Sequence, residues 1–250
     1  MISLKSEQEL ALMRQAGRIV AEVLARIEAD LVPGMTTADL EAIARQVIVE
    51  KHDAVPSFKG YRGYPAMICA SVNEEVVHGI PGPRRLNEGD IVGIDVGAIY
   101  RGYHGDAAIT LPVGRVDENS QRLLEVTAQA LQKGIDAAQA GKRTSDISRA
   151  IQECAEAQGF SVVREYTGHG IGRRMHEDPQ VLNYYEPRMG SVQLRPGMTL
   201  ALEPMVNAGD WLTRVLEDNW TVVTVDSKRS AHFEHTIVIT KNGPEILTRL

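Results

Sequence analysis

The sequence predicts one order of elements, two helices followed by strands, and predicts it twice, which limits the fold more than any other feature. Ser6 and Glu9 have the spacing of a capping box, and the apolar residues after them recur at steps of three and four. Pro33 and Gly34 end this first helix, and Thr37 begins a second one. The expected helices of the two halves cover residues 6–31, 37–48, 120–140 and 144–158.

The two halves align weakly when one is shifted by 107 residues. The matched pairs are Gly34 with Gly141, Thr37 with Thr144, Asp39 with Asp146 and Leu40 with Ile147. A helix start can recur by chance, so this alignment alone supports duplication and coincidence equally. Strands are expected at residues 66–71, 90–99, 103–113, 200–205, 220–225, 232–240 and 245–250. Because no linker separates the halves, we expect one α/β domain with a mixed or antiparallel sheet covered by helices.

Composition excludes several classes of protein. The chain has 250 residues and a formal net charge of −6, whereas a dedicated nucleic-acid binder usually carries a basic excess. Cys69 and Cys154 make no disulfide framework, which fits a reducing compartment, although a single bridge stays open. The first residues show no export signal, and no run of about 18 apolar residues occurs, so we expect a cytoplasmic protein without a membrane span.

Two acidic residues lie inside a predicted hairpin that is otherwise mostly apolar. If the loop takes the four residues 99–102, Asp95 and Asp106 are directly opposite each other on one face. Like charges in that position destabilise a sheet, so a cation between them would explain the pair. If the register differs, both carboxylates can face water, and from this segment alone that second interpretation is somewhat favoured.

Further acids and one histidine strengthen the first interpretation. Glu203 and Glu234 each lie in an apolar strand, where an unpaired buried carboxylate is disfavoured. His169 lies between glycines that let its side chain approach a site closely. His232 is a weak reserve ligand on the strand face of Glu234, whereas His235 lies on the opposite face. Together these residues suggest a cation site. The histidines to which no role is assigned are His52 and His104.

The motifs of several other enzymes are missing. The sequence has no G-x-S-x-G nucleophile elbow and no H-E-x-x-H helix. The glycines of residues 168–172 do not form G-x-G-x-x-G and open no predicted helix, which argues against a dinucleotide site. Cys69 and His78 would be a thiol nucleophile and its base, but their neighbours do not support this, and a packed cysteine is favoured.

Seven short motifs follow one another along nearly the whole chain. They lie at residues 73–81, 93–97, 104–106, 167–172, 175–179, 202–204 and 233–236. This ordered set resembles the methionine aminopeptidases. The resemblance implies the pita-bread fold, an α/β (α+β) fold in which two pseudo-symmetric halves form a curved, largely antiparallel sheet covered by helices. Residues 1–250 would be a single catalytic domain with halves at about 6–115 and 118–250. The short spacing from His169 to Glu203 is similar to the short bacterial type 1 form.

The resemblance also implies a centre of two divalent metal ions. Its ligands would be Asp95, Asp106, His169, Glu203 and Glu234. Asp106 and Glu234 would bridge the ions and relieve their mutual repulsion, and Glu203 would also shuttle a proton of the attacking water. His78 and His176 would bind the scissile amide nitrogen and the carbonyl or oxyanion respectively. Such ligands suit Mn, Fe or Co, and Zn also fits.

A methionine side chain needs an apolar, adaptable pocket, which the resemblance places beside His78 and His176. The other matching positions are Phe58, Tyr61, Tyr64, Cys69, Met175 and Trp220. Phe58 stands where the family often has a smaller residue, and Met175 replaces the usual phenylalanine. Both residues are apolar, so the pocket stays apolar, but the size of side chain that it prefers is affected. Without the resemblance these side chains would be interpreted as ordinary core. A monovalent cation is implied near Asn73, Glu75 and Ser230.

The implied activity is removal of the N-terminal methionine from nascent proteins and peptides when the second residue is small. A pita-bread Xaa-Pro peptidase is the alternative enzyme, against which the short chain and residues 73–81 argue. A non-catalytic pita-bread protein that binds partners or RNA is disfavoured, because all five ligands and both histidines are present. Expected partners are nascent polypeptide N-termini, with transient ribosome contact by family analogy and neither DNA nor membrane, and we expect a monomer.

Overall fold

The structure is a computed structural model that describes residues 2–250. Its helices are α1 (Glu7–Asp30), α2 (Thr37–Arg45), α3 (Glu118–Ala137) and α4 (Thr144–Glu156), with a π-helical segment at Gln46–Lys51 and a 3-10 turn at Tyr61–Gly63. The strands of the large sheet are β1 (Val55–Pro56), β2 (Ile68–Val72), β4 (Ile91–Tyr100), β5 (Tyr103–Pro112), β7 (Gly168–Gly170), β8 (Glu177–Val181), β9 (Thr199–Leu202), β14 (Glu234–Thr240) and β15 (Gly243–Ile246). The smaller sheets contain β3 (Glu75–Val77), β6 (Ser161–Val162), β10 (Met205–Asn207), β11 (Thr213–Val215), β12 (Val222–Thr224) and β13 (Ser230–His232).

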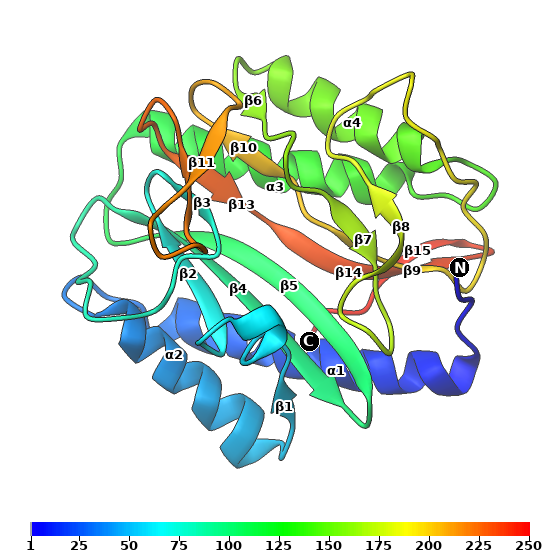
Figure 1. The fold of residues 1–250 in the computed structure, drawn as a ribbon, viewed down its shortest axis with the longest axis horizontal. Coiled ribbons are helices and arrows are strands. Elements are labelled where there is room, and N and C mark those ends of the chain that lie inside the picture. Colours follow the sequence, from blue (N-terminus) through cyan, green and yellow to red (C-terminus); the bar gives the residue numbers. More distant parts are fainter. Residues whose placement is uncertain (1) are drawn as a thin grey trace.

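A curved antiparallel sheet forms the centre of the molecule, and two pairs of helices pack against it (Figure 1). Its strand order is β1-β4-β5-β14-β9-β7-β8, with β2 also paired to β4 and β15 to β14. One apolar core joins α1 and α2 to β2 and β4, and another joins α3 and α4 to β9 and β14. Every strand pair is antiparallel, so the α/β class and the largely antiparallel sheet expected from the sequence are confirmed.

Polar caps set where the predicted helices begin. The Ser6 side chain accepts a hydrogen bond from the backbone N–H of Glu9, and the Glu9 carboxylate accepts one from the backbone N–H of Ser6, which confirms the capping box. α3 begins two residues earlier than predicted, because the Asp117 carboxylate caps it by accepting a hydrogen bond from the N–H of Ser120.

α1 crosses β5 at two facing glycines. A Cβ atom on Gly105 would lie 2.7 Å from the backbone nitrogen of Gly17, so no larger residue fits between the helix and the strand. Because neighbouring residues of a strand point to opposite faces, α1 supports β5 from the face opposite to the Asp106 side chain.

Two strands predicted as continuous are broken, and each break lies beside a glutamate. β9 ends at Leu202 and β10 begins at Met205, so Glu203 and Pro204 lie between the large sheet and a smaller one. Proline has no N–H for a sheet ladder, which accounts for this break. In the same way Phe233 separates β13 from β14, and Glu234 is the first residue of β14.

The hairpin of β4 and β5 turns more tightly than predicted. Arg101 and Gly102 form a two-residue turn with positive φ values of 47° and 82°, and Tyr100 pairs with Tyr103. The predicted four-residue loop is therefore wrong, and Asp95 pairs with Ala108 rather than with Asp106. Since the register differs by two residues, the side chains stay on the predicted faces.

Matched backbone hydrogen bonds occur at the start of the second helix of each pair. They are Gly34 N–H to Leu86 O and Thr37 N–H to Arg84 O in one half, and Gly141 N–H to Leu194 O and Thr144 N–H to Val192 O in the other. The donors are related by the 107-residue shift of the sequence alignment. A single domain of residues 1–250 with halves at 6–115 and 118–250 stays a prediction, which these contacts support.

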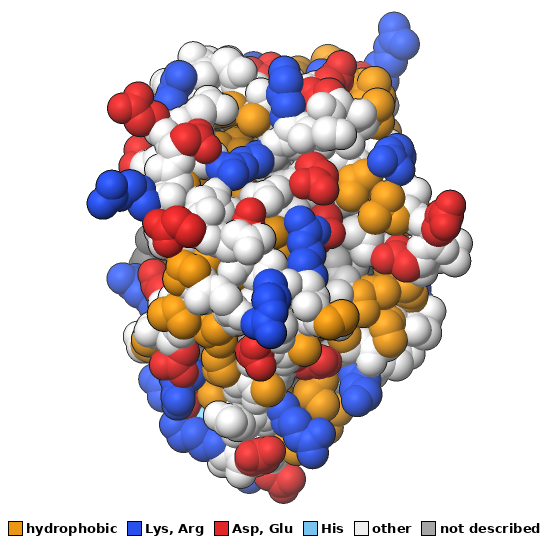
Figure 2. Space-filling model, turned by 90° about the vertical axis from the view of Figure 1, so that its left-hand side faces the viewer, with side chains coloured by type: hydrophobic (Ala, Val, Ile, Leu, Met, Phe, Trp, Pro, Cys, Tyr) orange, Lys and Arg blue, Asp and Glu red, His pale blue; other side chains and the backbone are white. Residues whose placement is uncertain are grey.

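The surface mixes charges of both signs. Figure 2 shows acidic and basic side chains interleaved over the face it draws, so this face lacks the continuous basic stripe that nucleic-acid binding usually needs. No helix within residues 2–250 is long and apolar enough to cross a membrane.

Candidate metal centre and active site

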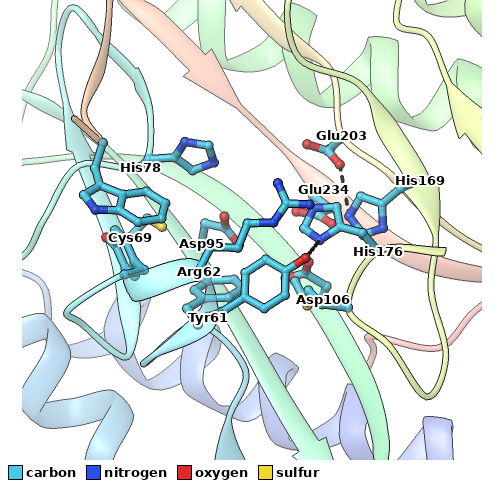
Figure 3. A pocket seen from close by; sticks show the side chains of 14 residues that line it. Tyr61, Arg62, Cys69, His78, Asp95, Asp106, His169, His176, Glu203 and Glu234 are labelled. Atoms are coloured by element: carbon cyan, nitrogen blue, oxygen red, sulfur yellow. Dashed lines mark hydrogen bonds and ion pairs between the residues drawn. The ribbon is translucent and has the colours of Figure 1, made fainter. Parts of the chain in front are cut away.

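One cavity of ≈ 150 Å³ collects the candidate residues of the sequence analysis (Figure 3). It is lined by Phe58, Tyr61, Arg62, Tyr64, Cys69, His78, Asp95, Asp106, His169, Met175, His176, Glu203, Trp220 and Glu234. All five candidate metal ligands, both candidate catalytic histidines and the six pocket positions are in this set. Arg62 is the lining residue that the sequence analysis did not identify.

The five candidate ligands lie on, or directly after, five neighbouring strands of the large sheet. Asp95 lies on β4, Asp106 on β5 and Glu234 at the start of β14. Glu203 directly follows β9, and His169 lies in the middle of β7. In the sheet these strands have the order β4-β5-β14-β9-β7, so residues far apart in the sequence meet on one face.

The ligand atoms are close together and lack other partners. One oxygen or nitrogen each of Asp106, His169 and Glu234 lies within 4.8 Å of the others, and His169 Nε2 lies 3.4 Å from Glu203 Oε1. Asp95 Oδ1, Asp106 Oδ1 and Glu234 Oε1 are buried without a hydrogen-bond partner in the described residues. Buried polar atoms are normally paired, so these oxygens fit cation ligands.

Without a cation the four carboxyl groups hold protons more tightly than usual. Burial raises the pKa of Asp95 from 3.8 to about 7, although a hydrogen bond with Asp106 acts in the opposite direction. Burial and the neighbouring carboxylates raise the pKa of the other three well above their usual values; these residues are Asp106, Glu203 and Glu234. A divalent cation would reverse this repulsion, so the residues present fit a metal centre.

His169 is oriented for metal ligation. Its Nδ1 lies 2.9 Å from the carbonyl oxygen of Gly170, and a carbonyl can only accept, so Nδ1 carries the proton. Burial and the nearby His176 lower the pKa of His169 to about 3, which keeps the ring neutral. The lone pair of Nε2 therefore points toward Glu203 and the carboxylate cluster.

His232 is buried beside Glu234 but is not among the residues that line the cavity. Its Nε2 has no hydrogen bond and lies 3.8 Å from Glu234 Oε2, and its role as a reserve ligand stays a prediction. His235 contacts Thr248 on the other side of β14. The two histidines without an assigned role are paired elsewhere, His52 with Glu22 and His104 with Ser57.

His78 faces the cavity from an unusual backbone conformation. Its φ of 61° is in the left-handed region, which non-glycine residues seldom adopt. The ring packs edge-on against Tyr166 and Trp220, with centroids 5.7 and 6.4 Å away. Burial, and to a smaller extent the electrostatic interaction with the His176 ring, lower the pKa of His78 to about 4, so the ring is neutral at physiological pH.

His176 is held by aromatic neighbours on the other side of the cavity. Tyr61 stacks on it at a centroid distance of 5.4 Å, and the Tyr61 hydroxyl lies 2.9 Å from Nδ1. The His169 ring is 4.1 Å away. Burial and the positive charge of Arg62 lower the pKa of His176. If the phenol donates to Nδ1, the Nε2–H of the neutral ring is free to donate into the cavity.

The apolar part of the cavity is a compact group of side chains. Phe58, Tyr64, Cys69 and Met175 are buried together, and Trp220 packs against them. Tyr64 donates to backbone carbonyls, which fixes its ring. Burial raises the pKa of the Cys69 thiol well above its usual value, and a thiol that stays protonated is a poor nucleophile, which disfavours the thiol alternative. Both cysteines are free, so no bridge joins them.

The three residues of the implied monovalent-cation site lie outside the cavity lining. The backbone N–H of Ser230 donates to the carbonyl oxygen of Asn73, so these two residues are neighbours. The Glu75 carboxylate accepts hydrogen bonds from Arg84 and from the backbone N–H of Val72. The monovalent cation stays a prediction.

Arg62 could not be identified from residue type alone. It lies in the segment Gly60–Tyr61–Arg62–Gly63, whose glycines indicate a tight turn but not what the turn faces. Arg62 itself has a positive φ of 49°.

The pita-bread fold and the carboxylate cluster at its centre are those of a metallopeptidase. The family model of metallopeptidase family M24 matches residues 11–241. Methionine aminopeptidase 1 of Bacillus subtilis is 54% identical over 250 residues, which cover 100% of both chains. The crystal structure of methionine aminopeptidase from Thermotoga maritima matches with a TM-score of 0.97 and 51% identity, again over 100% of both chains. The chain therefore belongs to metallopeptidase family M24 and, within it, to the methionine aminopeptidases.

A more distant structure shares the fold alone. Xaa-Pro dipeptidase from Bacillus anthracis matches with a TM-score of 0.78 and 22% identity, over 99% of this chain and 62% of that one.

Proposed function

We propose that this protein is a dinuclear-metal methionyl aminopeptidase that removes the N-terminal methionine from nascent proteins and peptides when the second residue is small. The observation that carries the proposal is the placement of five ligand side chains on neighbouring strands, with buried unpaired oxygens, beside an apolar cavity. The names of the relatives in family M24 support the same activity.

Asp95, Asp106, His169, Glu203 and Glu234 would hold the two ions. Asp106 and Glu234 lie on the paired strands β5 and β14, between Asp95 and the two remaining ligands, so they are central in the cluster. Two divalent ions bound there would lower the pKa of a shared water and polarise the scissile carbonyl. Four carboxylates and one imidazole fit Mn, Fe or Co, and also Zn, so the metal's identity is left to experiment.

Glu203 is the proposed proton carrier. Its carboxylate lies at the edge of the cluster, 3.4 Å from His169 Nε2. A carboxylate within reach of the attacking water can accept its proton and give it to the leaving amine.

His78 and His176 would bind the scissile peptide bond from two sides of the cavity. Both rings are neutral at physiological pH because burial lowers their pKa values. A neutral imidazole offers one N–H donor and one acceptor, so His78 can contact the amide nitrogen while His176 donates to the carbonyl oxygen and the tetrahedral oxyanion.

The apolar residues would take the methionine side chain. Phe58, Tyr64, Cys69, Met175 and Trp220 form a pocket without charged groups next to the carboxylate cluster. The N-terminal amine would then lie beside the metal centre and the thioether among the aromatic rings, an arrangement that selects an unbranched apolar first residue. Nascent polypeptide N-termini, transient ribosome contact, a monomeric state and a cytoplasmic location belong to this proposal.

Metal reconstitution tests the proposal. Protein stripped with a chelator should take up two equivalents of Mn²⁺ or Co²⁺ in calorimetry and regain release of methionine from Met-Ala-Ser. Asp106→Asn should lose both properties, whereas Glu118→Gln, the same change at an exposed site on α3, should keep them. A stripped protein that binds no divalent cation, or that releases methionine equally well in excess chelator, would contradict the proposal.

A further inference from the structure

Arg62 brings a positive charge to the opening of the cavity. It is an exposed residue that nevertheless lines the cavity together with the candidate ligands and the apolar pocket. In Figure 3 its side chain crosses the opening, with His78 on one side and His176 on the other. The positive charge of Arg62 therefore belongs to the site rather than to the general surface.

Arg62 has an unfavourable backbone conformation that the surrounding turn maintains. Its φ of 49° is unusual for a residue with a side chain, and the turn around it is closed by hydrogen bonds from Gly60 N–H to Tyr64 O and from Gly63 N–H to Gly60 O. Strained conformations of this kind cluster at ligand-binding sites, where the surrounding structure maintains them.

No carboxylate within residues 2–250 neutralises Arg62. Its guanidinium carbon lies 5.5 Å from the centroid of the Tyr61 ring, which is a cation–π contact that leaves the N–H donors free. The acids of the cluster are all candidate metal ligands, and bound divalent ions would take their charge. The guanidinium is therefore available to a carboxylate brought by the substrate.

The rest of the site shows which part of a peptide reaches Arg62. The scissile bond has to reach the metal centre, so the amino end of the peptide lies there, and the buried apolar pocket takes the methionine side chain. The remaining chain has to leave through the opening, past His176 and the exposed Arg62. The residues after the scissile bond are thus the ones that meet the guanidinium.

We propose that Arg62 is a specificity-determining residue that favours a carboxylate on the leaving part of the peptide, either an acidic side chain at the third residue or the terminal carboxylate of a very short peptide. This proposal rests on the proposed aminopeptidase activity. It predicts a ranking among nascent chains with the same first two residues, which the methionine pocket cannot distinguish.

The test compares pairs of peptides that differ in one charge. Met-Ala-Asp-Ser and Met-Ala-Asn-Ser, both amidated at the C-terminus, isolate the third side chain, and Met-Ala-Ser as free acid and as amide isolates the terminal carboxylate. For each pair we divide kcat/KM of the charged peptide by kcat/KM of the uncharged one. For at least one pair this ratio should be about fivefold higher in the unmodified protein than in Arg62→Gln, which is the effect expected from one partly exposed ion pair. Arg62→Lys should keep most of the preference, and Arg62→Glu should reverse it.

The controls separate Arg62 from general charge effects and from the activity itself. Arg101→Gln removes an arginine from the distant β4–β5 turn and should leave the ratios as in the unmodified protein. Added salt should reduce the preference, because it screens exposed charges. Equal ratios in the unmodified protein, Arg62→Gln and Arg62→Glu would overturn the role of Arg62 while leaving the aminopeptidase activity in place. Failure of the unmodified protein to release methionine from any of these peptides would overturn the proposed function and the role of Arg62 with it.

Discussion

The hydroxyl of Tyr61 lies 2.9 Å from Nδ1 of His176, and the two rings stack with their centroids 5.4 Å apart. This contact fixes the His176 ring plane and, if the phenol donates, leaves the second ring nitrogen as a donor toward the cavity. Tyr61 thus has a role that its assignment to an apolar methionine pocket did not include.

Replacing Tyr61 by phenylalanine keeps the stacked ring and removes the hydrogen bond. Loss of one such bond is worth about 1 kcal/mol, so kcat/KM should fall about fivefold. The kcat/KM of His176→Ala should fall further, by about 10²-fold, because this change removes the hydrogen-bond donor itself. Steady-state kinetics on Met-Ala-Ser checks both values. An unchanged kcat/KM in Tyr61→Phe would show that the contact does not orient His176 for catalysis.

His78→Ala should keep the fold and the metal but lose about 10²-fold or more in turnover, because a positioned polar group at the scissile bond is removed. Metal content and circular dichroism should stay unchanged while kcat falls. His52→Ala is the matched control, since His52 pairs with Glu22 away from the cavity. Near-normal turnover in His78→Ala would remove His78 from the mechanism.

In the hairpin that carries Asp95 and Asp106, the sheet face of the two acids was predictable from the sequence and the strand register was not. The two acids share a face because side chains alternate along a strand, and this survives a register error of two residues. The register itself depended on the turn, and nothing in the residue types indicated that Arg101 would adopt a positive φ beside Gly102. The alternation of side chains therefore predicted the sheet face of Asp95 and Asp106, but not which residue lies opposite each of them.

The sequence similarly predicted acids in apolar strands without predicting where those strands break. Glu203 and Glu234 lie where β9 ends and β14 begins, and this depends on the change from one sheet to another, which is a tertiary property. The start of α1 was predictable because its capping box uses residues only three apart. The apolar pocket was expected only from the family resemblance, and Arg62 was missed because its place in the site depends on the path of one turn.

Metal-free protein should become less stable as the pH rises through 7. Burial raises the pKa of Asp95 to about 7 in the folded state, and it raises the pKa of each of the other three acids well above its usual value. The stability that comes from a raised folded-state pKa is complete below the unfolded value and is lost as the pH rises from the unfolded value through the folded one. The buried histidines oppose this only near and below pH 6.5, where the unfolded chain takes up protons.

Urea unfolding of chelator-treated and Mn-loaded protein at pH 7 and pH 8.5 checks this expectation. The midpoint of the metal-free protein should fall over this interval, and the metal-loaded midpoint should stay nearly constant because its carboxylates are already ionised. A metal-free midpoint that rises with pH would show that the four acids do not carry extra protons in the folded protein.

The Lys5–Glu177 ion pair should stabilise the loop that carries His176. Its atoms lie 2.7 Å apart, and the two side chains are only 5% and 9% exposed. Lys5→Met leaves the Glu177 carboxylate buried without its charged partner, although hydrogen bonds from Ser3 and the Arg174 N–H stay, and loss of a buried charged partner typically costs about 3 kcal/mol of the free energy of unfolding. Lys51→Met, which breaks the exposed pair with Glu22, should cost less than about 1 kcal/mol. Equal effects in urea unfolding would contradict the buried role of Lys5.

The most direct test of the central claim is a competition between two peptides. Metal-loaded protein is mixed with equal concentrations of Met-Ala-Ser and Ala-Pro-Ser, and the free amino acids are quantified over time. The site predicts release of methionine, because an unbranched thioether fits the apolar pocket beside the carboxylate cluster. Preferential release of alanine from before proline would contradict the account and identify an Xaa-Pro peptidase instead.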